Sequence, residues 1–290
     1  MLTIKHIRDY ALFYLGCSVV CFAWFAWYEL TLFQQAPVFF LNKADISGNA
    51  LLATGIADGI TSSPVFCLVL DGLFFMLPFF LVAAVRRESR FTTTIAILSV
   101  LYNMAYAYLF SIFTFVSIEV FTGWLFVPLV FASAKLRTNY YLLHCIRLIF
   151  LVIFFSTALW KIRSGGLFNT EQLSAVLLRQ HASLLVSDPS SWFSRVLVFI
   201  IGHPAISYTL YLLAFALEFI FIVGFFTRRF DKFLIACFIG FIVFDYFLME
   251  INYFPWAPFL GVLYYSRFAE PLDIRMPELF NDRIISNVSR

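Results

Sequence analysis

Long apolar runs constrain the fold of this 290-residue chain more than any other feature of its sequence. A transmembrane helix needs about 20 consecutive apolar residues to cross the ~30 Å hydrocarbon core of a bilayer. Runs of about this length predict spans at 11–33, 64–85, 91–110, 112–134, 140–161, 206–226 and 233–249. The sequence therefore predicts an all-α fold, a polytopic transmembrane helix bundle.

Two weaker apolar segments leave the number of spans open at seven or eight. Residues 190–201 are too short to cross a bilayer and fit an interfacial or re-entrant position. Residues 253–266 fit a short eighth helix. We expect the transmembrane domain to cover residues 1–270 and a short polar C-terminal tail to cover residues 271–290.

The composition supports a membrane protein and excludes several classes of function. Hydrophobic residues make up 62% of the chain and charged residues 13%, whereas soluble domains have about half and about a quarter. The net charge of +3 is small and the basic residues lie in loops, so no nucleic-acid partner is expected. All five cysteines fall in apolar runs without metal-ligand spacing, which predicts neither a structural disulfide nor a zinc site.

The charges of the short loops predict the orientation in the membrane. Basic residues precede the first span and follow the second, fourth and sixth spans. They are Lys5, Arg8, Arg86, Arg87, Arg90, Lys135, Arg137, Arg228, Arg229 and Lys232. Because basic loops stay on the cytoplasmic side, we expect a multi-pass protein of the cell (inner) membrane with a cytoplasmic N-terminus. Lys161, at the end of the fifth span, then lies at the outer face.

The outer segment that follows Lys161 has a helical pattern of its own. Apolar side chains recur at helical spacing from Leu173 to Leu184, and Asn169 or Thr170 fits the N-cap position. This pattern predicts an amphipathic helix on the outer surface, with membrane lipid as its partner. Such a helix would roof whatever Lys161 faces.

Polar residues inside spans are costly, and they usually face a bundle interior or a cavity. Arg147 and Lys161 are 14 residues apart in the fifth span, which places them within about 40° of each other on one helix face. His144, three residues before Arg147, shares that face. Arg147 either snorkels to the interface or pairs with a carboxylate, for which Asp71 and Glu218 are possible partners.

Lys161 has two interpretations. A lysine at a helix end commonly snorkels to the membrane interface. It acts instead as a general base if its surroundings shield it from water, and Trp160, Phe168 and the roofing helix are placed to do so.

Three further polar residues join the candidate site. Glu218 lies in the sixth span and Asp245 in the seventh, where each carboxylate needs a partner. His181 lies on the surface helix, where it serves as acid, base or ligand or, as is usual for a lone histidine, has a structural role.

The fifth span also carries a family resemblance. Its sequence LLHCIRLIFLVIFFSTALWKI (142–162) resembles a helix of the membrane domain shared by vitamin K-dependent gamma-carboxylases and proteins with a horizontally transferred transmembrane (HTTM) domain. That helix has an arginine, about a dozen mostly apolar residues, a small pair, and a lysine followed by an aliphatic residue. Arg147, Thr157-Ala158 and Lys161-Ile162 match it, and the segments 70–102, 213–226 and 244–266 resemble other helices of the same domain.

The resemblance implies a chemistry for the lysine. In the carboxylases the matching lysine is the base that deprotonates vitamin K hydroquinone on the lumenal side. The resemblance therefore implies Lys161 as a base and a quinone-like molecule as its ligand. The chain departs from the family at Ala158, which replaces a glycine, and at Asp245, which replaces a histidine, and it lacks a tryptophan soon after the lysine. It also lacks the large lumenal region that binds the propeptide, so gamma-glutamyl carboxylation is not expected.

Two classes of function remain open. The first is a membrane enzyme that handles a quinone or lipid-like small molecule at the outer leaflet, with Lys161 as base. The second is a non-enzymatic membrane partner that assists maturation, export or immunity of a secreted peptide, as some short family members do. A transporter is less favoured because the sequence shows no inverted repeat.

Overall fold

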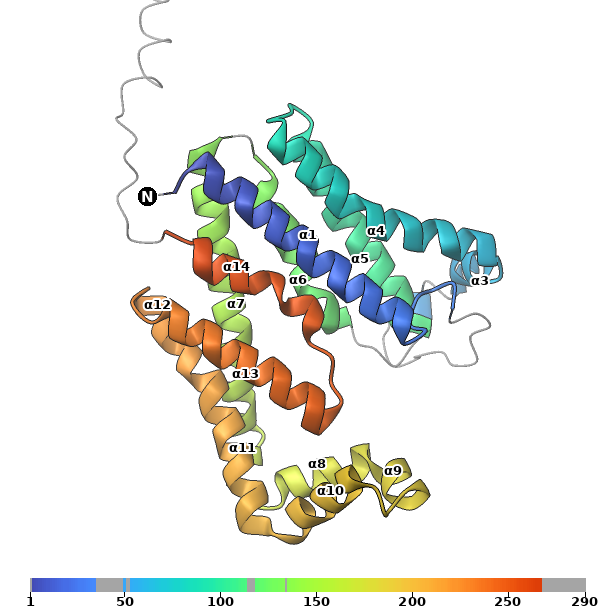
Figure 1. Cartoon of the computed structure of the whole chain (residues 1–290), viewed down its shortest axis with the longest axis vertical. Helices are drawn as coiled ribbons and strands as arrows, with labels where there is room; N and C mark the ends of the chain where they lie inside the picture. Colours follow the sequence, from blue (N-terminus) through green and yellow to red (C-terminus); the bar gives the residue numbers. More distant parts are fainter. Residues whose placement is uncertain (1, 35–48, 51–52, 114–117, 134, 268–290) are drawn as a thin grey trace, which may run out of the picture.

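The computed structural model describes residues 2–34, 49–50, 53–113, 118–133 and 135–267, and the predicted tail at 271–290 lies outside these ranges. Helices are the regular elements of the described residues, and no strand occurs among them. Six of the described helical segments are long and apolar enough to cross a membrane, so the chain is a multi-pass helical membrane protein (Figure 1). These segments are α1 (Ile4–Trp27), α4 (Pro64–Arg86), α5 (Thr92–Phe113), α7 (Leu136–Arg163), α11 (Pro204–Phe219) continuing through η4 (Ile220–Ile222) into α12 (Val223–Phe226), and α13 (Asp231–Met249).

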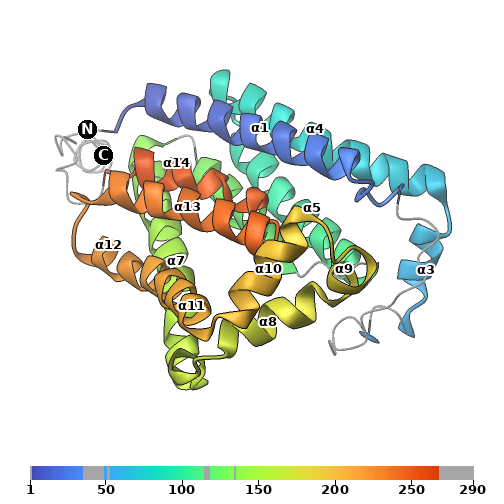
Figure 2. The ribbon, with the colours of Figure 1, turned by 60° about the horizontal axis from the view of Figure 1, so that its bottom comes forward.

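The long helices form two groups that face each other. Helix α1 packs along α4, and α4 packs along α5, on one side of the molecule (Figures 1 and 2). Helix α7 packs against α11 and, together with α12 and α13, forms the other side. The remaining short helices include α3 (Ile56–Thr61) and η3 (Gly166–Phe168), which lie after α1 and α7 respectively.

The span predicted across 112–134 is not a single continuous helix over its described residues. Residues 112 and 113 end α5, and three short elements follow, namely η1 (Ile118–Phe121), α6 (Thr122–Phe126) and η2 (Val127–Phe131). Pro128 stands in the first turn of η2, where it has no backbone N–H to continue the preceding helix. The segment nevertheless runs between the two ends of the bundle, because Phe121 stacks on Phe25 near the end of α1 and Phe131 contacts Tyr10 near its start.

Residues 253–266 form a second broken segment beside the first. It consists of η5 (Phe254–Trp256) and α14 (Pro258–Tyr265), a helix of 8 residues that is too short to cross a bilayer alone. Phe254 lies 6.1 Å from Trp24 at the end of α1, and Tyr265 lies 5.5 Å from Tyr10 near its start, measured between ring centroids. This segment therefore also runs along α1 between the two ends.

The two broken segments meet in the interior, between the two groups of long helices. A Cβ atom added to Gly123 of α6 would collide with the carbonyl oxygen of Pro255, and glycine, which has no Cβ, allows this close approach. Most side chains from Phe121 to Phe131 and from Pro255 to Leu263 are buried. Irregular backbone is tolerated at membrane depth where protein encloses it, and both segments have that enclosure.

We expect Gly123→Ala to destabilise the protein, because the new methyl group collides with backbone rather than with a mobile side chain. Overpacking of this kind costs about 1–3 kcal/mol. Thermal unfolding of the purified protein measures the loss. Gly16→Ala in α1 is the matched control, since a Cβ atom there meets nothing within 4 Å, and equal unfolding temperatures for both variants would contradict the close contact.

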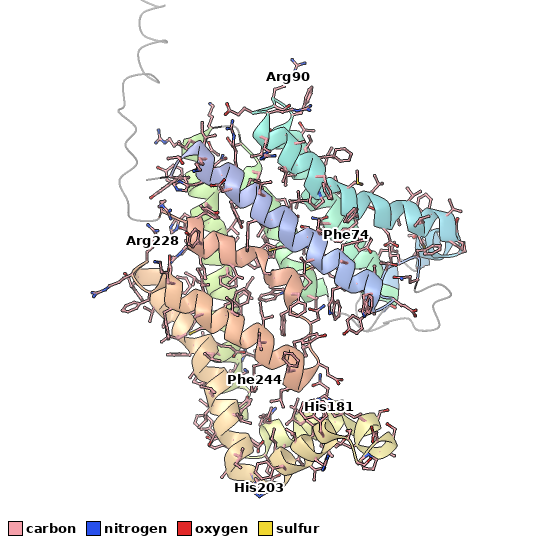
Figure 3. The ribbon with its side chains drawn as sticks, in the orientation of Figure 1. Phe74, Arg90, His181, His203, Arg228 and Phe244 are labelled. Carbon is pink, nitrogen blue, oxygen red and sulfur yellow. The ribbon has the colours of Figure 1, made fainter. Side chains whose placement is uncertain are left out.

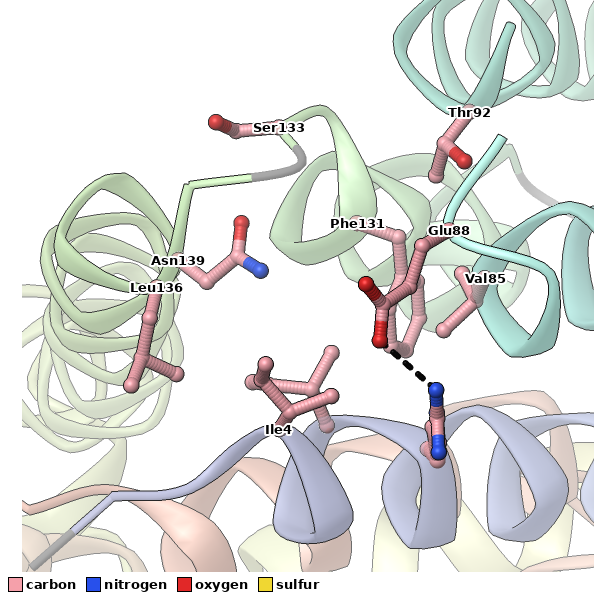
Figure 4. A pocket seen from close by; sticks show the side chains of 10 residues that line it. Ile4, Val85, Glu88, Thr92, Phe131, Ser133, Leu136 and Asn139 are labelled. Atoms are coloured by element: carbon pink, nitrogen blue, oxygen red, sulfur yellow. Dashed lines mark hydrogen bonds and ion pairs between the residues drawn. The ribbon is translucent and has the colours of Figure 1, made fainter. Parts of the chain in front are cut away.

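Basic residues gather at one end of the bundle, called here the basic end and defined by Arg8, Arg90 and Arg228. Figure 3 places Arg90 and Arg228 away from His181 and His203, which lie at the opposite end. At the basic end Arg8 donates to Glu88 at 2.7 Å beside a narrow cavity of about 40 Å³ (Figure 4). This cavity has room for a few water molecules only and does not suit an organic ligand.

A small helical unit, called here the surface unit (residues 172–202), lies at the end opposite the basic end. It contains α8 (Gln172–Gln180), α9 (Ala182–Ser187) and α10 (Trp192–Gly202), and it packs on α11 through α8. Its own buried cluster consists of Leu173, Leu177, Leu197 and Ile200. The prediction of an amphipathic helix after Lys161 is confirmed by α8. The predicted N-cap is wrong, since Glu171 stands there, and Asn169 accepts a hydrogen bond from its N–H.

Candidate functional site

Lys161 is held by an ion pair at the end opposite the basic end. Its Nζ donates to Glu218 Oε1 at 2.8 Å, and the side chains of the two residues are 24% and 6% exposed. The Tyr211 ring lies over the same ammonium, 5.5 Å from Nζ to the ring centroid. Lys161 is therefore turned toward the protein interior and does not extend away from the bundle as a snorkelling lysine does.

Local structure sets this position. Helix α7 ends at Arg163 with Ser164 as its C-cap, and Gly165 follows in the left-handed conformation (φ 74°), which favours glycine. Lys161 thus stands in the last turn, where a positive charge is favourable at the carbonyl end of a helix. Helix α11 runs antiparallel to α7. Tyr208, near the start of α11, donates to the carbonyl of Leu167, which follows α7, whereas Glu218, near the end of α11, meets the earlier residue Lys161.

Asp245 of α13 brings a second carboxylate to the same place. The residue is only 9% exposed, and within the described chain its side chain has no hydrogen bond or ion pair. Glu218 Oε2 is likewise buried and meets no described donor in hydrogen-bonding geometry, although the Thr157 hydroxyl, which donates to the Phe154 carbonyl, faces the same carboxylate. The site therefore holds one ammonium and two carboxylates, with acceptor oxygens that no described protein group fills.

These groups line a cavity of about 810 Å³. Small-molecule sites typically enclose about 300–1,000 Å³, with mostly apolar walls and a few convergent polar groups. The wall fits that description, because a few charged or polar side chains lie among mainly aromatic and aliphatic ones. Its other members are Ser156, Thr157, Trp160, Ser164, Gln172, Leu173, Val176, Leu210, Tyr211, Ala214, Phe241, Phe244, Met249, Ile251 and Tyr253.

The surface unit closes one side of this cavity. Helix α8 contributes Gln172, Leu173 and Val176 to the wall. Ser174 of α8 donates to Ser207 of α11 at 2.8 Å, which fixes α8 against the bundle. The amphipathic helix thus lies over the Lys161 cavity.

His181, expected as a possible acid, base or ligand, joins the surface unit to the end of α13. Its ring is buried, Nε2 donates to the Leu248 carbonyl at 2.9 Å, and Nδ1 lies 3.7 Å from Glu250 Oε2. The neighbouring Gln180 side chain donates to the Met249 carbonyl. His181 does not line the Lys161 cavity, and its contacts are those of a structural residue.

We expect His181→Ala to loosen the surface unit without unfolding the bundle. Losing a buried hydrogen bond costs about 1–3 kcal/mol, so amides of residues 172–202 should exchange hydrogen at least about fivefold faster. Hydrogen–deuterium exchange with mass spectrometry measures this locally. His203→Ala is the control, because that exposed ring bonds only to the Phe199 carbonyl one turn earlier. Unchanged exchange in the His181 variant would rule out this attachment.

Two residues expected to shield Lys161 do not do so. Trp160 reaches the cavity wall but is 62% exposed, and its ring stacks under the Arg163 guanidinium. Phe168 is 73% exposed. Burial of Lys161 comes instead from the neighbouring helices, through Glu218 and Tyr211.

Arg147 pairs with Asp231, a partner that the sequence did not indicate. Its Nη2 donates to Asp231 Oδ1 at 2.6 Å, its Nη1 donates to the Gly224 carbonyl at 2.7 Å, and the side chain is fully buried. The two expected partners are used elsewhere, since Asp71 accepts from Tyr106 and from backbone N–H groups, and Glu218 binds Lys161. The snorkelling interpretation of Arg147 is wrong as well.

We expect Arg147→Met to destabilise the protein strongly. The change leaves the Gly224 carbonyl buried without its donor and leaves Asp231 with the longer ion pair to Arg228, 3.7 Å away. Breaking a buried pair costs about 3–5 kcal/mol. Arg147→Lys should recover only part of the loss, because one ammonium cannot reproduce the fork that serves both acceptors. The unfolding temperatures of both Arg147 variants are measured and compared with that of Arg163→Met. This control removes an exposed arginine from the same helix. A mild effect of Arg147→Met would show that the pair is dispensable.

His144 does not belong to the Lys161 site. It is half-buried near the start of α7, 17 residues before Lys161, which corresponds to about 25 Å along the helix. Tyr211, by contrast, belongs to the site and was missed. A signal existed, because Tyr211 precedes Glu218 by seven residues and so shares its helix face.

A second cavity of about 880 Å³ adjoins the first, and Leu210 and Phe244 line both. Its walls are almost entirely apolar, with Glu250 and Asn252 as polar members. The remaining lining residues are Trp24, Tyr28, Trp192, Phe193, Val196, Ile200, Val243, Tyr246, Phe247 and Leu248. A polar cavity thus lies next to an apolar one of similar size.

Comparison with known proteins assigns no family to the chain. No family model, no curated protein and no solved structure matches it. Function has to be inferred from the cavity itself.

Proposed function

We propose that the protein binds a lipid-soluble small molecule, quinone-like or lipid-like, in the Lys161 cavity and that Lys161 acts on it as a base. The observation that carries this proposal is the Lys161–Glu218 ion pair on the wall of a cavity of about 810 Å³. Ionisable groups inside a membrane domain are expensive, and they usually mark a functional pathway or site.

The shape and polarity of the two cavities support a ligand with one polar end. The wall of the Lys161 cavity carries three charged residues, Lys161, Glu218 and Asp245, among largely apolar side chains. The adjoining apolar cavity begins at Phe244 and Leu210. A molecule with a polar head and a hydrocarbon tail fits both cavities. Moving its tail out of water lowers the free energy, and its polar head finds the partners that a buried polar group needs.

The ion pair supplies a route for base chemistry. The Lys161 ammonium passes a proton to Glu218 across the 2.8 Å contact, and the neutral amine then accepts a proton from a hydroxyl of the ligand. The ligand is then an anion, and the restored Lys161 ammonium beside it stabilises that negative charge. Glu218 keeps the proton that Lys161 first gave up. Proton transfer by a positioned side chain typically contributes about 10²–10⁴-fold to a rate.

The resemblance to the HTTM and vitamin K-dependent carboxylase membrane domain supports the same proposal, since Lys161 matches the base of the carboxylases. The loop charges support an inner-membrane location with the N-terminus in the cytoplasm and the Lys161 cavity open toward the outer leaflet.

The proposal is tested by proton transfer to Lys161 from a bound 1-naphthol, whose absorbance changes on ionisation. With protein in nanodiscs of neutral phosphatidylcholine, the wild type should increase the naphtholate fraction above that of empty nanodiscs. Lys161→Arg keeps a cation for Glu218 but cannot give up its proton, so it should bind the probe and leave it neutral. Lys161→Met should do the same, with some loss of stability.

Arg163→Met is the control, since it removes a cation two residues away that lies outside the cavity wall. It should behave as wild type. The base role is excluded if Lys161→Met ionises the probe as the wild type does, and the binding proposal is excluded if naphthol shows no saturable binding. The remaining function class would then be the non-enzymatic membrane partner of a secreted peptide.

A further inference from the structure

The charges that line the Lys161 cavity do not balance. Among its lining residues only Lys161, Glu218 and Asp245 are charged types. Lys161 satisfies one oxygen of Glu218, while Glu218 Oε2 and the Asp245 carboxylate have no hydrogen-bond partner among the described residues. A buried carboxylate is costly without a partner, so the site is one positive charge, or one proton, short of neutrality.

We infer that the ligand of this cavity carries an ammonium group, which binds between Asp245 and Glu218. This inference rests on the proposed function, because it assumes that a lipid-soluble molecule occupies the cavity. It narrows the lipid-like alternative to amphiphiles that carry an ammonium group beside the hydroxyl on which Lys161 acts. It disfavours a quinone-like ligand and ligands with carboxylate or phosphate heads. The carboxylates of Asp245 and Glu218 would repel an anionic head, and such repulsion is an effective way to exclude a ligand.

Aromatic side chains around the carboxylates support a cation in particular. Tyr211 already lies over one ammonium, that of Lys161, at 5.5 Å. Tyr253, Phe241 and Phe244 line the cavity with Asp245. Aromatic faces attract ammonium groups, more strongly when water is excluded.

A bare metal ion fits the site less well. Magnesium and calcium require about six or more oxygen ligands. The wall near Asp245 offers mainly aromatic and aliphatic side chains, and Lys161 already occupies one oxygen of Glu218. An organic ammonium needs fewer oxygens and gains from the apolar wall around it.

The test compares three probes that share an eight-carbon chain and differ in head charge. Octylammonium, octanol and octanoate are titrated at pH 7.4 into protein in neutral phosphatidylcholine nanodiscs, with empty nanodiscs subtracted, and binding is followed by calorimetry. Octylammonium should bind at least about tenfold more tightly than octanol, and octanoate most weakly, because one well-placed charge interaction readily supplies a tenfold difference.

Asp245→Asn should reduce the preference for octylammonium over octanol by about tenfold, because the variant removes the unpaired charge and keeps the side-chain size. Glu171→Gln is the matched control, since it removes an exposed carboxylate just before α8 that does not line the cavity. If the Asp245 variant does not fold, the order of the three probes on the wild type still decides.

The outcomes separate this inference from the proposed function. If octanoate or octanol binds as tightly as octylammonium, the cavity takes amphiphiles but the ammonium inference is overturned. The same holds if Asp245→Asn leaves the preference unchanged. If none of the three probes binds saturably but 1-naphthol does, the ammonium inference is overturned and the proposed function stands. If 1-naphthol also fails to bind, both are overturned.

Discussion

Backbone amides at membrane depth need hydrogen-bond partners within the protein, and this constraint organises the bundle. A continuous helix satisfies its backbone amides with its own hydrogen bonds. The segments 118–131 and 254–265 do not, because each is interrupted by proline and turns tightly. Both are enclosed by the long helices, and they touch each other at Gly123 and Pro255. The two groups of long helices thus form an enclosure around a core of irregular backbone, with side chains such as Trp124 and Phe259 filling it.

Helix α7 carries two buried ion pairs with different surroundings. Arg147 is fully enclosed, and the oxygens around it belong to Asp231, Gly224 and Thr227, which close the α12–α13 corner. Lys161 borders open space, and the carboxylate of Asp245 nearby has no described partner. The first pair therefore binds helices together, whereas the second leaves polar groups available to a ligand. The same residue types serve structure or chemistry according to what surrounds them.

Much of the architecture could be predicted from apolar length. The spans around α1, α4, α5, α7, α11 and α13 follow from runs long enough to cross a bilayer, and α8 follows from its helical periodicity. The run at 112–134 has the same apolar character but is not one helix. A segment that is buried on all sides needs apolar residues whether its backbone is helical or irregular. Composition alone therefore did not distinguish a helix from an enclosed irregular segment.

The sequence by itself determined which residues of α7 share a face, since the helical repeat places Arg147 and Lys161 on one side. Which carboxylate each cation meets was decided by tertiary structure alone. Asp231 and Glu218 are 84 and 57 residues from their partners, and their positions depend on how α11 and α13 pack along α7. A helix repeat is a local property, whereas the register between helices comes from side-chain packing across the whole bundle.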